Sequence, residues 1–180
     1  IAYSNGFHDN FIYTWRNDSG VWQNEIIESG LQGRSCDLEL YNDLPRVVYY
    51  DDISHNLKIG VKDTFSWDIF TLPSSDIDGN HCSMVIDSTD TIHAAFFNST
   101  TAMLEYVRFQ TDEFGLRYDI DGVSVSSQTD CAMDGMGNFQ VAYTDINSKE
   151  FRAATGELST WEIRTIASST ESCRSPGIVI

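Results

Sequence analysis

The chain has 180 residues, which is enough for one domain with a sizeable hydrophobic core. It contains 27 Asp and Glu residues against 11 Lys and Arg residues, and the resulting net charge of −16 excludes nucleic acids and anionic membranes as partners while favouring cations or basic proteins. No apolar stretch is long enough to cross a bilayer, and no signal peptide is visible at Ile1, so we expect a mature chain or a fragment.

The predicted elements are short strands, arranged in four copies of one pattern with a period of about 46 residues. Each copy has an aromatic residue, an Asn or Asp two positions later, a Leu or Phe six positions after that, a Trp or Leu, and a cysteine. The aromatic residues are Tyr3, Tyr49, Phe96 and Tyr143, and the Asn or Asp residues are Asn5, Asp51, Asn98 and Asp145. The later landmarks are Trp22, Trp67, Leu116 and Trp161, followed by Cys36, Cys82, Cys131 and Cys173.

The second copy shows how one unit is built. Strands are predicted over residues 36–41, 46–51, 56–61 and 66–72, with a turn at 42–45. Because the connections are short, neighbouring strands are expected to pair antiparallel as a meander. Four-stranded units at this period are typical of propeller blades, so we predict an all-β fold, a four-bladed β-propeller of four-stranded antiparallel blades. The repeated Asn or Asp is expected to hydrogen-bond backbone amides in the turn between the second and third strands.

The two ends of the chain each match part of one unit. Residues 173–180 match a first strand, and residues 1–5 match a second strand that lacks its first. We therefore predict a single domain over residues 1–180, in which Cys173–Ile180 pairs with Ile1–Asn5 and closes the ring. The blades are then residues 173–180 with 1–35, 36–81, 82–130 and 131–172. The competing interpretation is a piece of a larger ring that other chains close.

Two stretches carry a family resemblance. They are Val47-Val48-Tyr49-Tyr50-Asp51 with Leu57-Lys58-Ile59, and Ser83-Met84-Val85-Ile86-Asp87 with Ile92-His93-Ala94-Ala95-Phe96-Phe97. They resemble the tandem repeats of bacterial secreted β-propellers, grouped with sialidase-like (BNR-like) repeats. The resemblance covers nearly the whole chain, but the Ser-x-Asp-x-Gly-x-Thr-Trp box of true sialidases is absent. It implies extracellular or cell-surface placement and a binding or structural role, and it supplies no catalytic residues.

One cysteine per unit is the most distinctive chemistry of the sequence. On innermost strands, Cys36, Cys82, Cys131 and Cys173 are expected to ring the central channel near one mouth. Three interpretations stay open: disulfides, buried free thiols, and an axial metal held by four thiolates. The disulfides would be Cys36–Cys82 with Cys131–Cys173, or Cys36–Cys173 with Cys82–Cys131. Close Cys-x2-Cys pairs, which structural zinc sites usually use, are absent.

Several polar motifs are weaker candidates. The sequons at Asn17 and Asn98 would be glycosylation sites in a secreted protein, which the cysteine content also favours. Residues 76–80 and 119–122 resemble calcium loops, although turn chemistry explains their Asp and Gly residues better. No cofactor is expected beyond the weak alternatives of a calcium ion or an axial metal. The histidines do not have metal-binding or catalytic spacing; they are His8, His55, His81 and His93.

Three aromatic residues are candidates for a binding surface. Phe7 in a turn, with Tyr13 and Trp15 on a strand, would form a stacking platform for a sugar or a partner protein. The alternative is packing between adjacent blades, which bury large side chains against each other. Packing is the favoured interpretation, because propeller blades pack face to face through large side chains.

The sequence favours a non-catalytic extracellular module that binds a glycan or a protein, or that forms part of a larger assembly. The alternative is a glycan hydrolase with its site at the channel mouth, which requires convergent acids and a basic anchor. The Lys and Arg residues show no recurrence at equivalent blade positions, which counts against it. A third hypothesis is a metal or redox site built from the axial cysteines.

Overall fold

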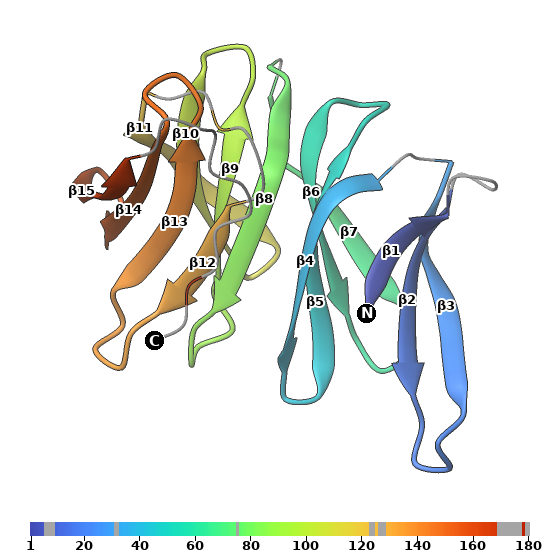
Figure 1. Ribbon diagram of the computed structural model, residues 1–180. Helices are drawn as coiled ribbons and strands as arrows, with labels where there is room; N and C mark the ends of the chain where they lie inside the picture. Colours follow the sequence, from blue (N-terminus) through green and yellow to red (C-terminus); the bar gives the residue numbers. More distant parts are fainter. Residues whose placement is uncertain are drawn as a thin grey trace.

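Four antiparallel β-sheets stand next to one another in the computed structural model of the chain (Figure 1). The structure describes residues 1–5, 10–30, 33–74, 76–122, 125, 129–168 and 178. These residues form strands, turns and irregular segments but no helix, so none of them belongs to a helix that could cross a membrane. The prediction of an all-β fold is confirmed.

Each sheet is a meander of consecutive strands. Sheet A contains β1 (Ala2–Asn5), β2 (Asn10–Arg16) and β3 (Trp22–Ser29). Sheet B contains β4 (Gly33–Tyr41), β5 (Leu44–Asp51), β6 (Asn56–Lys62) and β7 (Trp67–Thr71). Sheet C contains β8 (Asp78–Ile86), β9 (Ile92–Asn98), β10 (Met103–Gln110) and β11 (Glu113–Asp121). Sheet D contains β12 (Asp130–Met133), β13 (Phe139–Asp145), β14 (Glu150–Glu157) and β15 (Thr160–Ser168).

The repeated Asn or Asp has the structural role that the sequence predicts. Oδ1 of Asp51 accepts the amide of Ile53 at 3.0 Å, and Oδ1 of Asn98 accepts the amide of Thr100 at 2.9 Å. In sheet D, Oδ1 of Asp145 accepts the amide of residue 147, also at 3.0 Å. The side chain therefore fixes the turn between the second and third strands in three of the four units.

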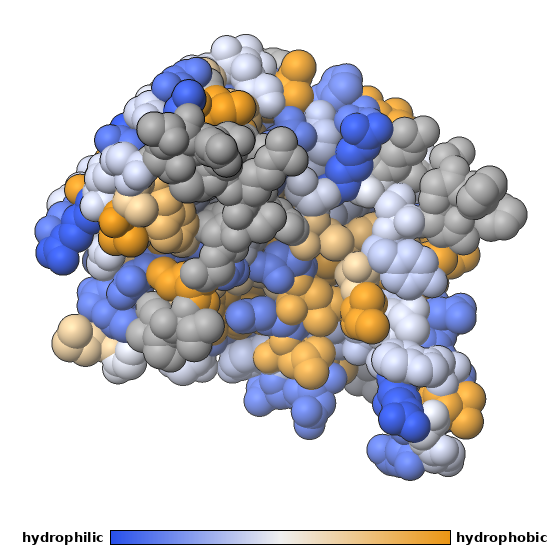
Figure 2. Space-filling view, viewed as in Figure 1, coloured by the Kyte–Doolittle hydropathy of each residue, from blue (hydrophilic) through white to orange (hydrophobic). Residues whose placement is uncertain are grey.

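The sheets pack face to face in the order A, B, C, D, with one apolar cluster at each of the three junctions. Phe11 of sheet A stacks on Tyr49 of sheet B with ring centroids 4.4 Å apart. Between sheets B and C, Phe70 meets Phe109 at 4.8 Å. Figure 2 shows apolar residues gathered in the middle of the visible face, beside β4 and β1, with polar residues around them. The alternating apolar residues of each strand thus bury against a neighbouring sheet, as blades of a propeller do.

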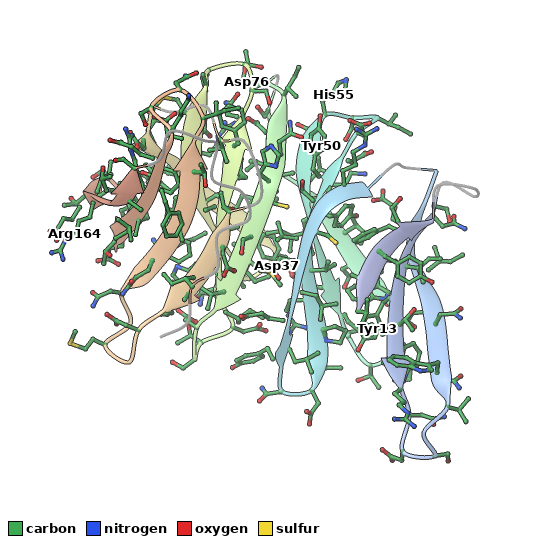
Figure 3. All side chains as sticks on the ribbon, in the orientation of Figure 1. Tyr13, Asp37, Tyr50, His55, Asp76 and Arg164 are labelled. Carbon is green, nitrogen blue, oxygen red and sulfur yellow. The ribbon has the colours of Figure 1, made fainter. Side chains whose placement is uncertain are left out.

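The innermost strands of successive sheets are joined by a repeated hydrogen bond. The amide of Met84 on β8 donates to Asp37 on β4 at 3.0 Å, in the gap visible between these strands in Figure 3. The amide of Cys131 on β12 donates to Oγ of Ser83 on β8 at 3.1 Å. The amide of Ile178 donates to Asp130 on β12 at 2.6 Å. The separations in sequence are 47, 48 and 48 residues, so Ile178 takes the place beside sheet D that the next innermost strand would have.

The predicted closing strand itself lies, apart from Ile178, outside the described residues. Its pairing with Ile1–Asn5 therefore stays a prediction. Within the described part of the chain, sheet A has three strands. Sheets A and D stand at the two ends of the series in Figure 1, with B and C between them.

The predicted cysteine ring needs correction. Cys36, Cys82 and Cys131 are free thiols, so the predicted disulfides that use them are absent, while Cys173 lies outside the described residues. Cys131 also does not occupy the position of the other two. The equivalent residue in sheet D is Thr129, whose Oγ1 donates to a carbonyl of the preceding innermost strand at 2.5 Å, as Sγ of Cys82 does at 2.8 Å. The hydroxyl of Thr129 thus makes the same hydrogen bond as the thiol of Cys82.

The thiols have the character of buried filler. Burial raises the pKa of Cys82 and of Cys131 well above the ordinary value, and it also raises that of Cys36. Thiolate is therefore scarce at neutral pH, and reactivity is low. Among the described residues no group of three His, Cys, Asp or Glu side chains is placed to hold a metal ion.

A candidate ligand groove between sheets C and D

Of the three aromatic residues singled out from the sequence, the structure describes Tyr13 and Trp15, which lie together on β2. Tyr13 lies at the junction of sheets A and B, where its ring meets Trp67 edge-on at 5.7 Å (Figure 3). Trp15 stacks on Tyr13 at 5.3 Å and is partly exposed, whereas Phe7 lies outside the described residues. Tyr13 therefore contributes to packing between sheets, and a binding role for Phe7, Tyr13 and Trp15 stays a prediction.

The polar motifs are mostly occupied by contacts within the protein. Asn98 is fully buried and donates to Glu105 at 2.8 Å, so the folded protein has no room for a glycan there. Asn17 accepts the amide of Val21 at 2.9 Å in a turn, and its glycosylation stays a prediction. Asp78, the second acid of the first calcium-like loop, is fully buried and receives two hydrogen bonds from the guanidinium of Arg117.

The second calcium-like loop, residues 119–122, is likewise occupied by contacts within the protein. Asp121 accepts the hydroxyl of Tyr143 at 2.7 Å and forms an ion pair with Arg152 at 2.8 Å. In both loops, then, an arginine is the cation that faces the acid. Of the histidines, His8 lies outside the described residues, and His55 hydrogen-bonds Tyr50 at 3.0 Å at the upper rim in Figure 3.

Two junctions share an ion-pair arrangement that the sequence analysis missed. At the junction of sheets A and B, Glu28 accepts the hydroxyl of Tyr49 at 2.6 Å and pairs with Lys58 at 2.8 Å. Asp121, Tyr143 and Arg152 repeat this arrangement between sheets C and D. Lys58 and Arg152 both follow the Leu or Phe landmark directly, so basic residues do recur at equivalent positions. Reading the residue after that landmark would have revealed them.

The opposite rim differs from one junction to the next. Arg46 and His93 are equivalent, since each lies five residues before the repeated Asn or Asp. Between sheets B and C, Arg46 binds both carboxylate oxygens of Asp90 at 3.2 and 2.7 Å, and this pair fills the junction. Between sheets C and D, the residue equivalent to Asp90 is Gly137, because both occupy the same left-handed position of the turn before the second strand. A groove of about 560 Å³ remains there.

His93 forms part of the wall of this groove. Its Nδ1 lies 2.6 Å from the hydroxyl of Tyr106, and its Nε2 lies 3.3 Å from Asp87. Burial lowers the pKa of His93 despite the opposing effect of Asp87, so the ring is neutral at pH 7. Both ring nitrogens are engaged, and His93 therefore supports the wall rather than offering a free nitrogen for proton transfer.

Two carboxylates of the groove are held by their own turns. Burial alone would raise the pKa of Asp87, but hydrogen bonds from Thr89, Thr91 and His93 outweigh it and lower the pKa to about 2. Hydrogen bonds from the side chain and amide of Asn138 lower the pKa of Asp134 in the same way. Both carboxylates thus fix the shape of the groove.

Arg108 and Glu157 are different. Both line the groove and are exposed, and within the described part of the chain neither forms an ion pair or a hydrogen bond. An unpaired arginine is unexpected in a chain with a net charge of −16. Among the described residues, the groove therefore offers one free cationic donor and one free anionic acceptor.

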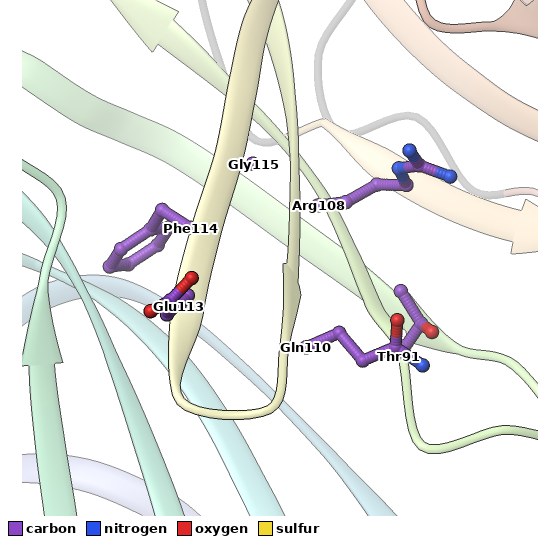
Figure 4. Close-up of a pocket in the computed structure, with 6 residues that line it drawn as sticks. All are labelled: Thr91, Arg108, Gln110, Glu113, Phe114 and Gly115. Carbon is purple, nitrogen blue, oxygen red and sulfur yellow. The ribbon is translucent and has the colours of Figure 1, made fainter.

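Arg108 also lines an adjoining recess of about 230 Å³. Figure 4 shows Arg108, Gln110 and Thr91 on one side of β11, with the ring of Phe114 on the other. The register of β10 and β11 shifts between Val107 and Phe109, so Arg108 lies at an irregularity of the sheet. Bulges of this kind re-aim side chains and are frequent next to binding sites.

Comparison with known proteins adds information on the fold. No protein-family model and no curated protein matches the sequence. A solved structure of a GH43 β-1,3-galactosidase superposes with a TM-score of 0.62 at 10% identity, covering 91% of this chain and 42% of that chain. The fold is of the β-propeller type. This chain spans less than half of the galactosidase chain, and the similarity does not single out sialidase-like repeats.

Proposed function

We propose that the protein is a non-catalytic carbohydrate-binding module whose glycan lies in the groove between sheets C and D. One observation carries this proposal: Arg108 and Glu157 line the same groove, and no other described residue forms an ion pair or a hydrogen bond with either side chain. A sugar hydroxyl both donates and accepts hydrogen bonds, so a neutral glycan satisfies both side chains together. Extracellular or cell-surface placement belongs to the proposal as well, and it is supported by the resemblance to secreted propeller repeats.

The remaining groups of the groove favour binding over hydrolysis. Glycoside hydrolysis requires two carboxyl groups, one of which has a raised pKa and acts as the acid. Asp87 and Asp134 have lowered pKa values and are held by turn amides. Among the described residues, that leaves Glu157 as the free carboxylate of the groove.

Calorimetric titration with β-1,3-, β-1,4- and α-linked oligosaccharides tests the proposal. Arg108→Gln and Glu157→Gln are each expected to weaken binding at least tenfold, because each removes a charged hydrogen-bond partner. Arg164→Gln is the matched control, since Arg164 is exposed and pairs with Glu162 on β15, away from the groove lining. Failure of every oligosaccharide to bind, or equal binding by all three variants and the unsubstituted protein, would remove the groove as a glycan site.

A glycan hydrolase is the second candidate, favoured by the fold similarity to a galactosidase and by Glu39. Burial raises the pKa of Glu39, against the hydrogen bond from the Ile86 amide, and Asp37 lies on the same side of β4. A half-buried carboxyl with a raised pKa is suited to a general acid. Release of reducing ends from β-1,3-galactan that disappears in Glu39→Gln would establish this candidate; the binding module is expected to release none.

We also propose that residues 173–180 supply the closing strand between sheets D and A. The hydrogen bond from Ile178 to Asp130 supports this, because it repeats the bond between β8 and β4. The side chains of sheets A and D support it as well. In sheet A, Ile12 occupies the position that Lys58 and Arg152 have in their sheets, and in sheet D, Ala167 occupies the position that Glu28 and Asp121 have. The base and the acid are both replaced by apolar residues, as a D–A junction without the ion pair requires.

A further inference from the structure

We infer that the site takes an extended oligosaccharide of several rings rather than a single sugar, with Arg108 between two subsites. This inference rests on the proposed carbohydrate function. Arg108 lines both the groove of about 560 Å³ and the recess of about 230 Å³, so one side chain belongs to two adjoining hollows. A ligand confined to one hollow would leave the other unused.

The path between the hollows runs across the strands of sheet C. Arg108 on β10 is paired in register with His93 on β9, which borders the groove. Gly115 on β11 borders the recess. Neighbouring strands lie about 4.8 Å apart, so the path from β9 to β11 is about 10 Å long. That distance exceeds the width of one sugar ring and requires a chain of linked rings.

The chemistry of the recess matches that of the groove. Glu113 is exposed and, like Glu157, has no ion pair within the described residues. Gln110 supplies an amide that both donates and accepts, and its contact with Thr89 is long, at 3.4 Å. Each hollow therefore has a free carboxylate, and Arg108 lies between them. The same hydroxyl-rich ligand suits both.

Gly115 keeps the recess open. A Cβ placed at this position would meet only the backbone and Cβ of Arg108, at 3.4 and 3.9 Å, so a side chain fits without disturbing the sheet. It would then project where the structure now has space. Gly115→Phe is therefore a substitution that blocks the recess while the groove keeps its lining.

An anionic glycan fits less well than a neutral one. Asp87, Asp134, Glu113 and Glu157 border the path, and among the described residues Arg108 is the one cation that lines these hollows. A chain of uronic acids would bring repeated negative charges towards these carboxylates within a protein of net charge −16. The favoured ligand class is thus a neutral, linear oligosaccharide.

A chain-length series tests the inference. Calorimetric titrations would use β-1,3-galacto-, β-1,4-gluco-, β-1,4-xylo- and β-1,4-manno-oligosaccharides of one to six residues, with oligogalacturonates as the anionic comparison. For the series that binds, affinity is expected to rise at least tenfold from one residue to three or four and then level off. Gly115→Phe and Glu113→Gln are expected to reduce affinity for the tetramer and to leave that for the monosaccharide unchanged. Thermal unfolding of Gly115→Phe checks that the variant is folded.

The outcomes separate this inference from the function on which it rests. Equal affinity for monosaccharide and tetramer, or a Gly115→Phe variant that binds the tetramer normally, would overturn the extended site and leave the groove as a single-sugar site. Stronger binding of oligogalacturonates would overturn the neutral ligand class. Absence of binding in every series would overturn the proposed function itself, and the inference with it.

Discussion

Two junctions of the same construction behave differently at the same rim. Between sheets B and C, Arg46 reaches across to Asp90 and the rim is filled. Between sheets C and D, the equivalent residues are His93 and Gly137, and a groove remains. The backbone is the same at both junctions, because both come from the repeat. Two side chains at equivalent positions determine whether an ion pair fills the space between the blades or a groove remains. In a propeller, binding capacity can therefore arise where one repeat lacks a structural pair that its neighbour has.

The largest effect is expected from breaking the filled junction. Arg46 is only 6% exposed, and Arg46→Ala leaves Asp90 and the carbonyl of Lys62 without its donors. We expect a loss of about 2–3 kcal/mol in the free energy of unfolding, measured by urea titration. Arg164→Ala, at an exposed ion pair, should change it by less than about 0.5 kcal/mol. Similar losses in both variants would mean that the Arg46 pair contributes no more than a surface pair.

A smaller effect on the free energy of unfolding is expected at the innermost strands. Here the comparison is between Asp37 on β4 and Asp130 on β12, which both accept hydrogen bonds from the innermost segment that follows in the chain. Asp37 accepts two hydrogen bonds from β8, and Asp130 accepts one from Ile178. We expect Asp37→Ala to lower the free energy of unfolding by about 2 kcal/mol and Asp130→Ala by about 1 kcal/mol. Urea titration measures both, and carboxypeptidase digestion reports whether the terminal segment is released in Asp130→Ala. An Asp130→Ala variant with unchanged stability and unchanged digestion would speak against the closing strand.

The smallest effect is a pH dependence of stability that arises from His93 in the wall of the open junction. Because burial lowers the pKa of His93, the unfolded chain binds a proton at a higher pH than the folded chain does. The contribution to stability is complete above the ordinary imidazole pKa of about 6.5 and is lost as the pH falls below it. His93→Gln should therefore reduce the loss of stability between pH 7 and pH 5.5, measured by urea titration at both values.

His81 provides the comparison for this pH experiment. Burial lowers its pKa as well, so His81→Gln should also reduce the slope, while the groove lining stays intact. The two substitutions together should reduce it further. An unchanged slope in His93→Gln would contradict the neutral, buried imidazole.

The sequence predicts the scaffold better than the site. The four strands of the second unit and the turn role of Asp51 follow from local patterns of alternation and turn chemistry, which the fold preserves. The prediction placed Cys131 wrongly because it aligned the cysteines of all units. The strand pairing shows the shift, since Cys36 is paired with the landmark Tyr49 but Cys131 is paired with Val141. The groove could not be predicted, since it depends on which side chains of two neighbouring sheets meet. Comparing Arg46 with His93 and Asp90 with Gly137 would have indicated where a pair is missing.

The most direct test is a crystal structure of the protein with a bound tetrasaccharide from the series that binds. The account predicts sugar density between sheets C and D, with hydroxyls within hydrogen-bond distance of Arg108 and Glu157 and with further rings reaching towards Gly115. Density confined to β4 beside Asp37 and Glu39, or against Trp15 on sheet A, would contradict it.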